Sequence, residues 1–488
     1  MPKRPTTLAL ALPPRSPSAP VTQWLYGAIR AEILEGRLRP GARLPASRDL
    51  ARQYGLSRGT IVSAFAQLES EGYIDGTVGS GTYVSETLPD DLLHAGPPRA
   101  VQEARPHRAL SMYGRRVKLF PAYRARPIRA FRADQPALDL FPTTLWAQLA
   151  ARRMRRATTG LLLGTSPMGY GPLRDAVADY VRTARGVQCT ADQVAIVSGV
   201  QEALDLVTRL FVDPGDRVCM EDPGYPGAAF AFEARGARLT GLAVDDEGMT
   251  IPLGRARLAY VTPGHQFPLG ISMSLRRRLA LLEWAHGAGA VILEDDYDSE
   301  YRYSGRPVPA LQGLDRRGCV LFAGSFSKVL FPSLRLGYLI VPPDLVDLVT
   351  ATLSITIRHA PLIDQAILGD FIAEGHFARH VRRMREIYAE RLSVLMECVQ
   401  SRLRGLLDIR GLEAGLQTAA WLTRGLDAQA AAQAASERDV EVTPLAWYTR
   451  GRRPRVIGEG LHLGFAAVDV PEIRRGVREL AASLESLS

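Results

Sequence analysis

From about Phe120 onward, short apolar runs alternate with segments that have the 3.6-residue periodicity of helices. Such alternation predicts a mostly parallel sheet with helices on both faces, where the chemistry gathers at the carboxyl ends of the strands. The runs that we interpret as strands are 193–197, 217–221, 257–262, 290–294, 319–323 and 338–341. Because 488 residues are too many for one such core, we expect at least two domains.

The net charge of +9 lies entirely near the N-terminus. Residues 1–84 carry 10 basic and 6 acidic side chains, residues 85–135 carry 10 and 5, and the remainder carries 40 of each. A basic segment beside a neutral body indicates a polyanionic partner such as double-stranded DNA, although a solvated basic tail would give the same count.

Three further features bear on the cellular compartment. The four cysteines are widely scattered, which fits a reducing cytoplasm rather than a disulfide framework or a metal clip. No apolar run is long enough to span a bilayer, and we expect no membrane partner. Residues 1–19 are rich in proline and lack the apolar core of a signal peptide, so we interpret them as a flexible arm.

Residues 20–85 have the pattern of a winged helix-turn-helix. A helix is expected over 21–36, and Ser47 is expected to cap a short helix that ends at Tyr54. After the turn at Gly55, Ser57 is expected to cap a second helix over 58–71. The apolar face that we predict for this second helix is Ile61, Val62, Phe65 and Leu68. The Gly-rich tip 76–81 lies between two short strands and predicts a β-hairpin wing.

In a module of this kind the start of the second helix enters the major groove, while flanking basic residues bind phosphate. The candidates for base edges or nearby phosphates are Arg58, Thr60 and Ser63, those for phosphate alone are Arg43 and Arg48, and those for the wing tip are Gly79, Ser80 and Gly81. A protein-interaction module is the alternative for this pattern. Residues 86–118 have little apolar periodicity and are interpreted as an extended linker, so the large domain is placed at 119–488.

Lysine is scarce in this chain. Lys3, Lys118 and Lys328 are the only lysines, and the other 57 basic residues are arginine, which cannot form an imine. Lys328 follows the predicted strand 319–323, at the edge of the sheet where chemistry gathers. This position indicates a functional amine.

Other residues at the same edge complete a recognisable set. Gly199 precedes a predicted helix, whose free N–H groups are suited to a phosphate. Asp295, Asp296 and Asp298 follow the strand 290–294, and three acids in four residues could also mark a metal site. An amine, a carboxylate and anion donors are what pyridoxal phosphate (PLP) needs for its aldehyde, its ring nitrogen and its phosphate.

Two parts of the chain resemble known families. The run LPASRDLARQYGLSRGTIVSAFAQLESEGYI, followed by GSGTYV, resembles the winged helix-turn-helix of the GntR family of bacterial repressors. The stretch from about 120 to 488 resembles fold-type I aminotransferases. Its runs EDPGYPG, VTPGHQFPLG, EDDYDSEYRYSGRP and SFSKVLFPSLRLGY are similar to those of the MocR/GabR subgroup of GntR regulators. The resemblance implies an α+β winged helix followed by an α/β PLP-binding domain with a small C-terminal subdomain.

The resemblance also implies roles for individual residues. Lys328 would form the Schiff base, Asp295 would face the ring nitrogen, and Tyr297 would hydrogen-bond the ring hydroxyl. The residues implied for the phosphate are Ser325, Arg335 and the turn Gly199, Val200 and Gln201, and Tyr225 would stack on the ring. No metal ligand is assigned.

Two positions depart from the aminotransferase pattern. His462 stands where such enzymes carry an arginine that clamps the substrate α-carboxylate, and Gly164 stands where many carry a tyrosine that reaches the neighbouring subunit's phosphate. A structural strand residue is the alternative for His462. The first departure puts amino-acid transamination in doubt.

The resemblance and the two departures together predict a cytoplasmic, homodimeric, PLP-dependent transcription regulator. We expect it to sense PLP, or an amine that lacks the usual α-carboxylate contact, through the Schiff base on Lys328, with at most residual transaminase activity. An active aminotransferase with an accessory DNA-binding domain is the main alternative, and a metal-dependent enzyme built on the three acids is the third.

Overall fold

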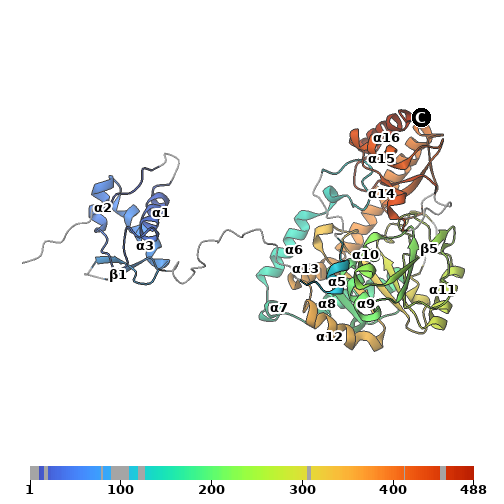
Figure 1. Cartoon of the computed structure of the whole chain (residues 1–488), viewed down its shortest axis with the longest axis horizontal. Helices are drawn as coiled ribbons and strands as arrows, with labels where there is room; N and C mark the ends of the chain where they lie inside the picture. The colour runs from blue at the N-terminus through green and yellow to red at the C-terminus, as the bar shows by residue number, and fades with distance from the viewer. Residues whose placement is uncertain are drawn as a thin grey trace, which may run out of the picture. The chain divides into compact units, whose positions relative to one another are not determined.

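The computed structural model describes residues 10–15, 20–77, 81–88, 109–118, 127–304, 309–410, 413–450 and 458–487. The chain divides into two compact units, Met1–Arg108 and Ala109–Ser488 (Figure 1). Within the described ranges, no helix combines the length and the apolar character needed to cross a membrane.

The first unit is a three-helix module with a hairpin. Its elements are α1 (Val21–Leu34), α2 (Ser47–Tyr54), α3 (Arg58–Ser70), β1 (Ile74–Thr77) and β2 (Gly81–Val84). The two strands are antiparallel, with Ile74 opposite Val84, and all three helices contribute buried residues to one apolar core. The predicted winged helix-turn-helix is therefore confirmed.

Two details of this unit differ from the prediction. Ser47 is the first residue of α2 and not its cap, because the N-cap position belongs to Ala46, which has no side-chain acceptor. Val62 is 49% exposed, whereas Ala64 is buried. The buried stripe of α3 follows the spacing of Ile61 and Phe65, and Val62 lies about 100° around the helix from Ile61.

Part of the segment predicted as a flexible arm is packed on this module. Leu10 is 3% exposed, and its carbonyl accepts hydrogen bonds from Gln53 and from the Tyr54 hydroxyl. The Leu12 N–H donates to the same hydroxyl at 2.9 Å, and the Trp24 indole donates to the Pro13 carbonyl at 3.2 Å. Residues 10–13 are therefore a docked segment and not the free arm that we predicted. The reason is that leucines alternate there with positions that face solvent.

The second unit is built on an eight-stranded sheet with the order β3-β10-β9-β8-β7-β4-β5-β6. Its strands are β3 (Val194–Val197), β4 (Arg217–Asp222), β5 (Arg238–Asp245), β6 (Gly248–Met249), β7 (Leu258–Val261), β8 (Val291–Asp296), β9 (Val320–Ser325) and β10 (Gly337–Ile340). The strands from β9 to β5 are parallel neighbours, and β10 is antiparallel to both β3 and β9. The mostly parallel sheet is confirmed, and the six predicted strands end within two residues of the observed ones.

Helices cover both faces of this sheet. The helices of this unit that precede the smaller subdomain are α5 (Met112–Arg116), α6 (Thr143–Arg155), α7 (Thr159–Leu163), α8 (Gly171–Arg185), α9 (Val200–Phe211), α10 (Pro226–Arg235), α11 (Leu275–Ala288), α12 (Val346–Thr356) and α13 (Leu362–Ala373). Alternate strand residues point to opposite faces: Ala195 packs in the core formed with α9, α10 and α12, and Ile196 in the core formed with α8 and α13. The α11 helix packs against β7 and β8 on the second face.

A smaller subdomain follows the large sheet. It contains the antiparallel sheet β11-β12-β14-β13, made of β11 (Leu407–Ile409), β12 (Gln417–Leu422), β13 (Thr443–Pro444) and β14 (Gly460–Gly464). Its helices are α14 (His376–Arg402), α15 (Ala428–Glu437) and α16 (Val470–Glu485), which gather at one end of this unit (Figure 1). The segment that precedes α6 pairs with β14 through Phe131 and Gly464, so it lies directly against this subdomain.

The end of the predicted linker belongs to the large unit. Residues Met112–Arg116 form α5, Arg116 donates to the Arg235 carbonyl at 3.2 Å, and Lys118 lies 3.5 Å from the Glu233 carboxylate. The prediction of an extended linker over 86–118 is corrected at this end, because two basic side chains find partners at the end of α10.

The cap of α3 gives a testable prediction for the first unit. The Ser57 hydroxyl accepts from the Thr60 N–H at 3.1 Å, so Ser57→Ala should lower the opening free energy of the α3 amides by about 1 kcal/mol. Hydrogen exchange on the full chain measures this. Ser70→Ala is the control, since the Ser70 hydroxyl only donates to the Gln67 carbonyl. Equal exchange in the two variants would contradict the capping role.

Candidate functional sites

The sheet topology brings distant segments to one edge. Gly199 follows the end of β3, Asp295 lies near the end of β8, and Lys328 follows the end of β9. Arg335 precedes β10, which runs in the opposite direction and therefore begins at this same edge. Tyr225 follows β4 and caps α10. Each segment contributes to the candidate site because parallel strands end together.

Lys328 has a partner that the sequence did not indicate. Its Nζ donates to the carboxylate Oδ1 of Asp134 at 2.8 Å and to the Asp134 main-chain carbonyl at 3.0 Å. Burial acts to raise the pKa of Asp134, but the charge of Lys328, followed by that of His462, lowers it on balance. Lys328 and Asp134 therefore form an ion pair. No local pattern could reveal it, because 194 residues separate the two.

Asp295 is a buried carboxylate of which only one oxygen accepts a hydrogen bond from the described residues. Its Oδ2 accepts from the Tyr260 hydroxyl at 2.6 Å, while its Oδ1 has no hydrogen-bond partner within the described part of the chain. Burial is the main reason that the pKa of Asp295 is raised to about 7. A protonated ring nitrogen would supply both the missing donor and a compensating charge.

Tyr297 lies beside the imidazole of His265, which Asp298 orients. The Nδ1 atom of His265 is 2.9 Å from Oδ1 of Asp298 and 3.0 Å from the Tyr297 hydroxyl. A carboxylate can only accept, so the Nδ1 proton points to Asp298. The hydroxyl hydrogen of Tyr297 is then available to another acceptor, as the role implied by the resemblance requires. His265 was not among the predicted residues.

The predicted phosphate residues meet at the start of α9. Gly199 has φ of 105°, and a β-carbon built on it would lie 3.4 Å from two guanidinium nitrogens of Arg335. The first amides of α9, including those of Val200 and Gln201, have no carbonyl ahead of them within the helix. A cation and free amide donors around a glycine form a cradle that suits a phosphate.

Ser325 and Tyr225 are placed by local hydrogen bonds. The Ser325 hydroxyl accepts from the Ser327 N–H at 3.1 Å in the turn that carries Lys328. The Tyr225 hydroxyl donates to Gln201 Oε1 at 3.4 Å, and its ring lies edge-to-face on Phe267 with centroids 5.7 Å apart. Gln201 thus uses its side chain to hold Tyr225 and its main chain for the helix terminus.

The three acids near the end of β8 bind three different partners. Asp295 binds the Tyr260 hydroxyl, Asp296 binds Arg185 at 2.6 Å, and Asp298 binds His265. Their carboxylates therefore diverge, which weighs against the metal-dependent enzyme considered as the third alternative.

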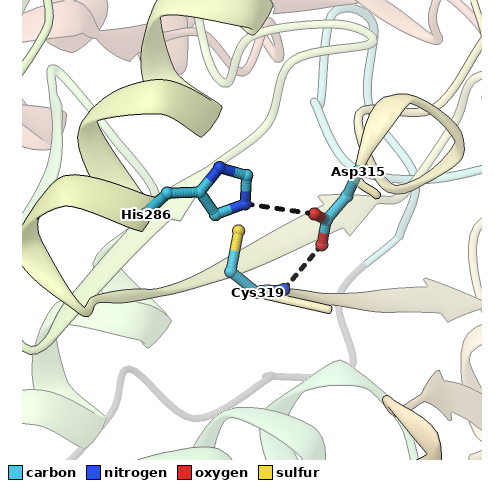
Figure 2. A group of neighbouring side chains, drawn as sticks. All are labelled: His286, Asp315 and Cys319. Carbon is cyan, nitrogen blue, oxygen red and sulfur yellow. Dashed lines mark hydrogen bonds and ion pairs between the residues drawn. The ribbon is translucent and has the colours of Figure 1, made fainter. Parts of the chain in front are cut away.

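Another group of possible metal ligands consists of His286, Asp315 and Cys319 (Figure 2). Asp315 accepts backbone N–H bonds from residues 317, 319 and 320 and lies 3.4 Å from the His286 ring. Burial of the Cys319 thiol, and after it the charge of Asp315, raise the pKa of this thiol to about 12. The group lies where β9 begins, at the edge opposite Lys328, and Asp315 has the contacts of a turn cap.

His462 is fully buried in β14, at the position that the resemblance gives to a clamping arginine. Its Nδ1 lies 2.9 Å from the Tyr448 hydroxyl, and its Nε2 has no hydrogen-bond partner among the described residues. Burial lowers its pKa to about 4, although Asp134 acts in the opposite direction. The ring is therefore neutral at physiological pH, and it carries no charge to attract a carboxylate.

The backbone conformation of Gly164 explains why this position has a glycine. It ends α7 with φ of 123°, which strains any residue with a side chain, and a β-carbon there would lie 3.1 Å from His359 Nε2. A tyrosine at this position would be strained, so the departure from the aminotransferase pattern has a conformational cause.

The candidate DNA residues occupy the first unit. Arg58 and Ser63 on α3 are exposed, as the major-groove role requires, and Thr60 is half-buried with its hydroxyl 2.8 Å from that of Ser57. Because Thr60 takes part in the helix cap, it has less freedom to reach a base than Arg58.

The other DNA candidates lie on α2 and beside the wing. Arg48 is exposed on α2. Arg43 is exposed, pairs with Tyr83 through the main chain, and places its guanidinium 6.0 Å from the Tyr83 ring and close to Gly81. Gly79 and Ser80 lie outside the described residues.

Two family models match this chain. Residues 22–84 match the bacterial regulatory proteins of the gntR family, and residues 135–480 match aminotransferase class I and II. Among solved structures, α-aminoadipate aminotransferase LysN from Thermus thermophilus is 28% identical, with a TM-score of 0.69, and the match covers 78% of this chain and 97% of LysN.

Curated relatives align with both units at once. The probable rhizopine catabolism regulatory protein MocR of Rhizobium meliloti is 40% identical over 97% of this chain and 95% of its own. The pyridoxine biosynthesis transcriptional regulator PdxR of Corynebacterium glutamicum is 31% identical over 97% and 98%. The chain therefore belongs to the MocR-type transcription regulators, in which a GntR-family winged helix-turn-helix is joined to an aminotransferase class I/II domain.

Proposed function

We propose that this regulator binds operator DNA through its first unit and uses the large unit to sense PLP or an amino compound, with little or no transaminase turnover. The observation that carries the proposal is a nearly complete set of residues suited to PLP beside a neutral imidazole. Lys328, Asp295 and the α9 cradle fit PLP, while His462 stands in place of a clamping arginine. A site that keeps the residues for PLP but contacts the carboxylate of an amino acid only weakly is suited to sensing.

PLP fits the residues present. Asp295 would neutralise the ring nitrogen, Tyr297 would donate to the ring hydroxyl, and the start of α9 would bind the phosphate with Ser325 and Arg335. When bound, PLP supplies an aldehyde that captures amines and a ring that accepts electrons. Lys328 is the amine that would hold it, and its ion pair with Asp134 keeps its side chain in the site.

The relatives support sensing in two ways. PdxR is named for pyridoxine biosynthesis, which favours the cofactor itself as a signal, and MocR is named for the catabolism of rhizopine, which favours a small metabolite. The main alternative is an active aminotransferase with an accessory DNA-binding unit, and the structural similarity to LysN favours it. The weakened carboxylate site decides our preference for a sensor.

One experiment tests the proposal against that alternative. The protein should be yellow with PLP, and its affinity for the DNA upstream of its own gene should change on addition of PLP or of an amine. Lys328→Ala should lose the visible absorption band and the DNA response. Lys118→Ala is the matched control, since Lys118 is 67% exposed and pairs with Glu233. Steady turnover of an amino acid and a keto acid without any change in DNA affinity would instead show an aminotransferase.

The proposal includes a homodimer, as expected for a two-fold protein that reads repeated half-sites. Exposed apolar residues support it: Leu162 and Leu163 on α7 are 65% and 83% exposed, and Ile355 on α12 is 84% exposed. The ends of these helices come together where Gly164 approaches His359. Exposed apolar clusters commonly mark interfaces.

Leu163→Asp should therefore raise the dimer dissociation constant by about 10-fold or more, because a charge would be desolvated in the interface. Analytical ultracentrifugation of the cofactor-loaded protein measures this. Leu253→Asp is the matched control, since Leu253 is 84% exposed in a loop elsewhere. A wild-type protein that stays monomeric at micromolar concentration would rule out the dimer.

Asp295 gives a prediction in which stability and cofactor affinity change in opposite directions. The folding of a chain with such a buried carboxyl becomes less favourable as the pH rises from the pKa of Asp295 in the unfolded chain to about 7, its pKa in the folded protein. At pH 8 the free energy of unfolding is lowered by about 4 kcal/mol. Asp295→Asn should therefore raise the Tm of the cofactor-free protein by several degrees at pH 8, and by less at pH 5.5. The same change should weaken PLP binding about 10-fold or more.

Calorimetry and equilibrium titration measure the two effects. Asp192→Asn, at a side chain that is 90% exposed, should change neither. A lower Tm together with unchanged PLP affinity would contradict the role of Asp295.

A further inference from the structure

The segment that faces Lys328 is held in a fixed and unusual conformation. Asp134 has φ of 68°, a region that non-glycine residues seldom adopt. Its N–H donates to Oε1 of the buried Gln417 at 2.8 Å, and Phe131 pairs with Gly464 two residues after His462. The main chain of Asp134 is thereby held in place, and its side chain, which is 39% exposed, pairs with Lys328.

The electrostatics around Asp134 are the reverse of those of a carboxylate clamp. Asp134 carries the negative charge, and the pKa of the nearby His462 is lowered to about 4, first by burial. Arg335 lies at the Gly199 cradle, where it is committed to the phosphate in our proposal. A ligand carboxylate that approaches Lys328 from this side would meet a like charge.

A ligand group that takes the place of Lys328 beside Asp134 must be a hydrogen-bond donor. When Lys328 is committed to the cofactor, Asp134 loses the donor that Nζ supplies here. A carboxylate can only accept, so the group that replaces Nζ must itself donate.

We propose that Asp134 determines the specificity of the effector site, and that the effector is an amine with a hydrogen-bond donor, an ammonium or a hydroxyl, where an amino acid has its carboxylate. The inference rests on the proposed function, because it takes PLP to be held on Lys328. The amino nitrogen of the ligand would take the place of Nζ on the cofactor aldehyde, and Lys328 would be released as a free amine. The inference adds the chemical class of the ligand and the residue that selects it. Asp134 would contact that donor group directly, in the place that Nζ of Lys328 occupies here.

Three amines that differ at a single group test this inference. Alanine, alaninol and 1,2-diaminopropane carry a carboxylate, a hydroxymethyl and an aminomethyl group on the same carbon. The cofactor-loaded full chain should bind alaninol or diaminopropane at least about 10-fold more tightly than alanine, measured by the change in its visible absorption. A stronger response to diaminopropane identifies charge as the selected feature, and a stronger response to alaninol identifies the hydroxyl.

Variants of Asp134 separate this role from a structural one. Asp134→Asn should reduce the preference over alanine about 10-fold or more, because the amide lacks the charge. Asp134→Gly suits the positive φ and should give the same loss, so a folding defect of the first variant would not hide the result. Asp439→Asn is the matched control, since Asp439 also has positive φ, at 56°, and its side chain is 73% exposed.

The outcomes are distinct. Tighter binding of alanine in the wild type, or an unchanged ranking in both Asp134 variants, overturns the inference. The proposed function stands in that case if PLP still changes DNA affinity. A wild-type chain that never develops visible absorption with PLP overturns both.

Discussion

The common direction of the strands from β9 to β5 is the constraint on which the large unit depends. Because these strands are parallel, residues that follow them converge at one edge, although the chain separates Gly199 from Lys328 by more than a hundred positions. The antiparallel β10 contributes to the same edge by its first residues, which brings Arg335 to Gly199. The site is thus a property of the topology and only secondarily of the individual loops.

A second consequence of this convergence is electrostatic. The edge gathers Asp295 and Asp134 near one lysine, and burial raises the pKa of Asp295, one of whose oxygens has no hydrogen-bond partner among the described residues. Such a site is unfavourable when empty and becomes favourable when a cationic ring is bound, so cofactor affinity and intrinsic stability oppose each other there. At the position that the resemblance gives to a clamping arginine, the neutral His462 supplies no positive charge.

The sequence predicted features whose causes are local. Strands were found within two residues because burial on both faces gives continuous apolar runs, and Ser57 was recognised because a cap uses residues three apart. Ser47 and Val62 were misassigned because a shift of one residue moves a cap or turns a side chain by 100°. The contacts of Asp134 with Lys328 and Gln417 were missed because they join segments that only the folded chain brings together.

The bond between Asp134 and Lys328 has a consequence for the start of the large unit. Asp134 belongs to the stretch through which the chain enters the large unit, after the docked helix α5 and before α6. Anything that competes for the lysine therefore also releases one attachment of that entry stretch. By thermodynamic reciprocity, a change that displaces Asp134 must also change the affinity of whatever binds Lys328. One ion pair thus makes the start of the large unit a part of the ligand-binding equilibrium.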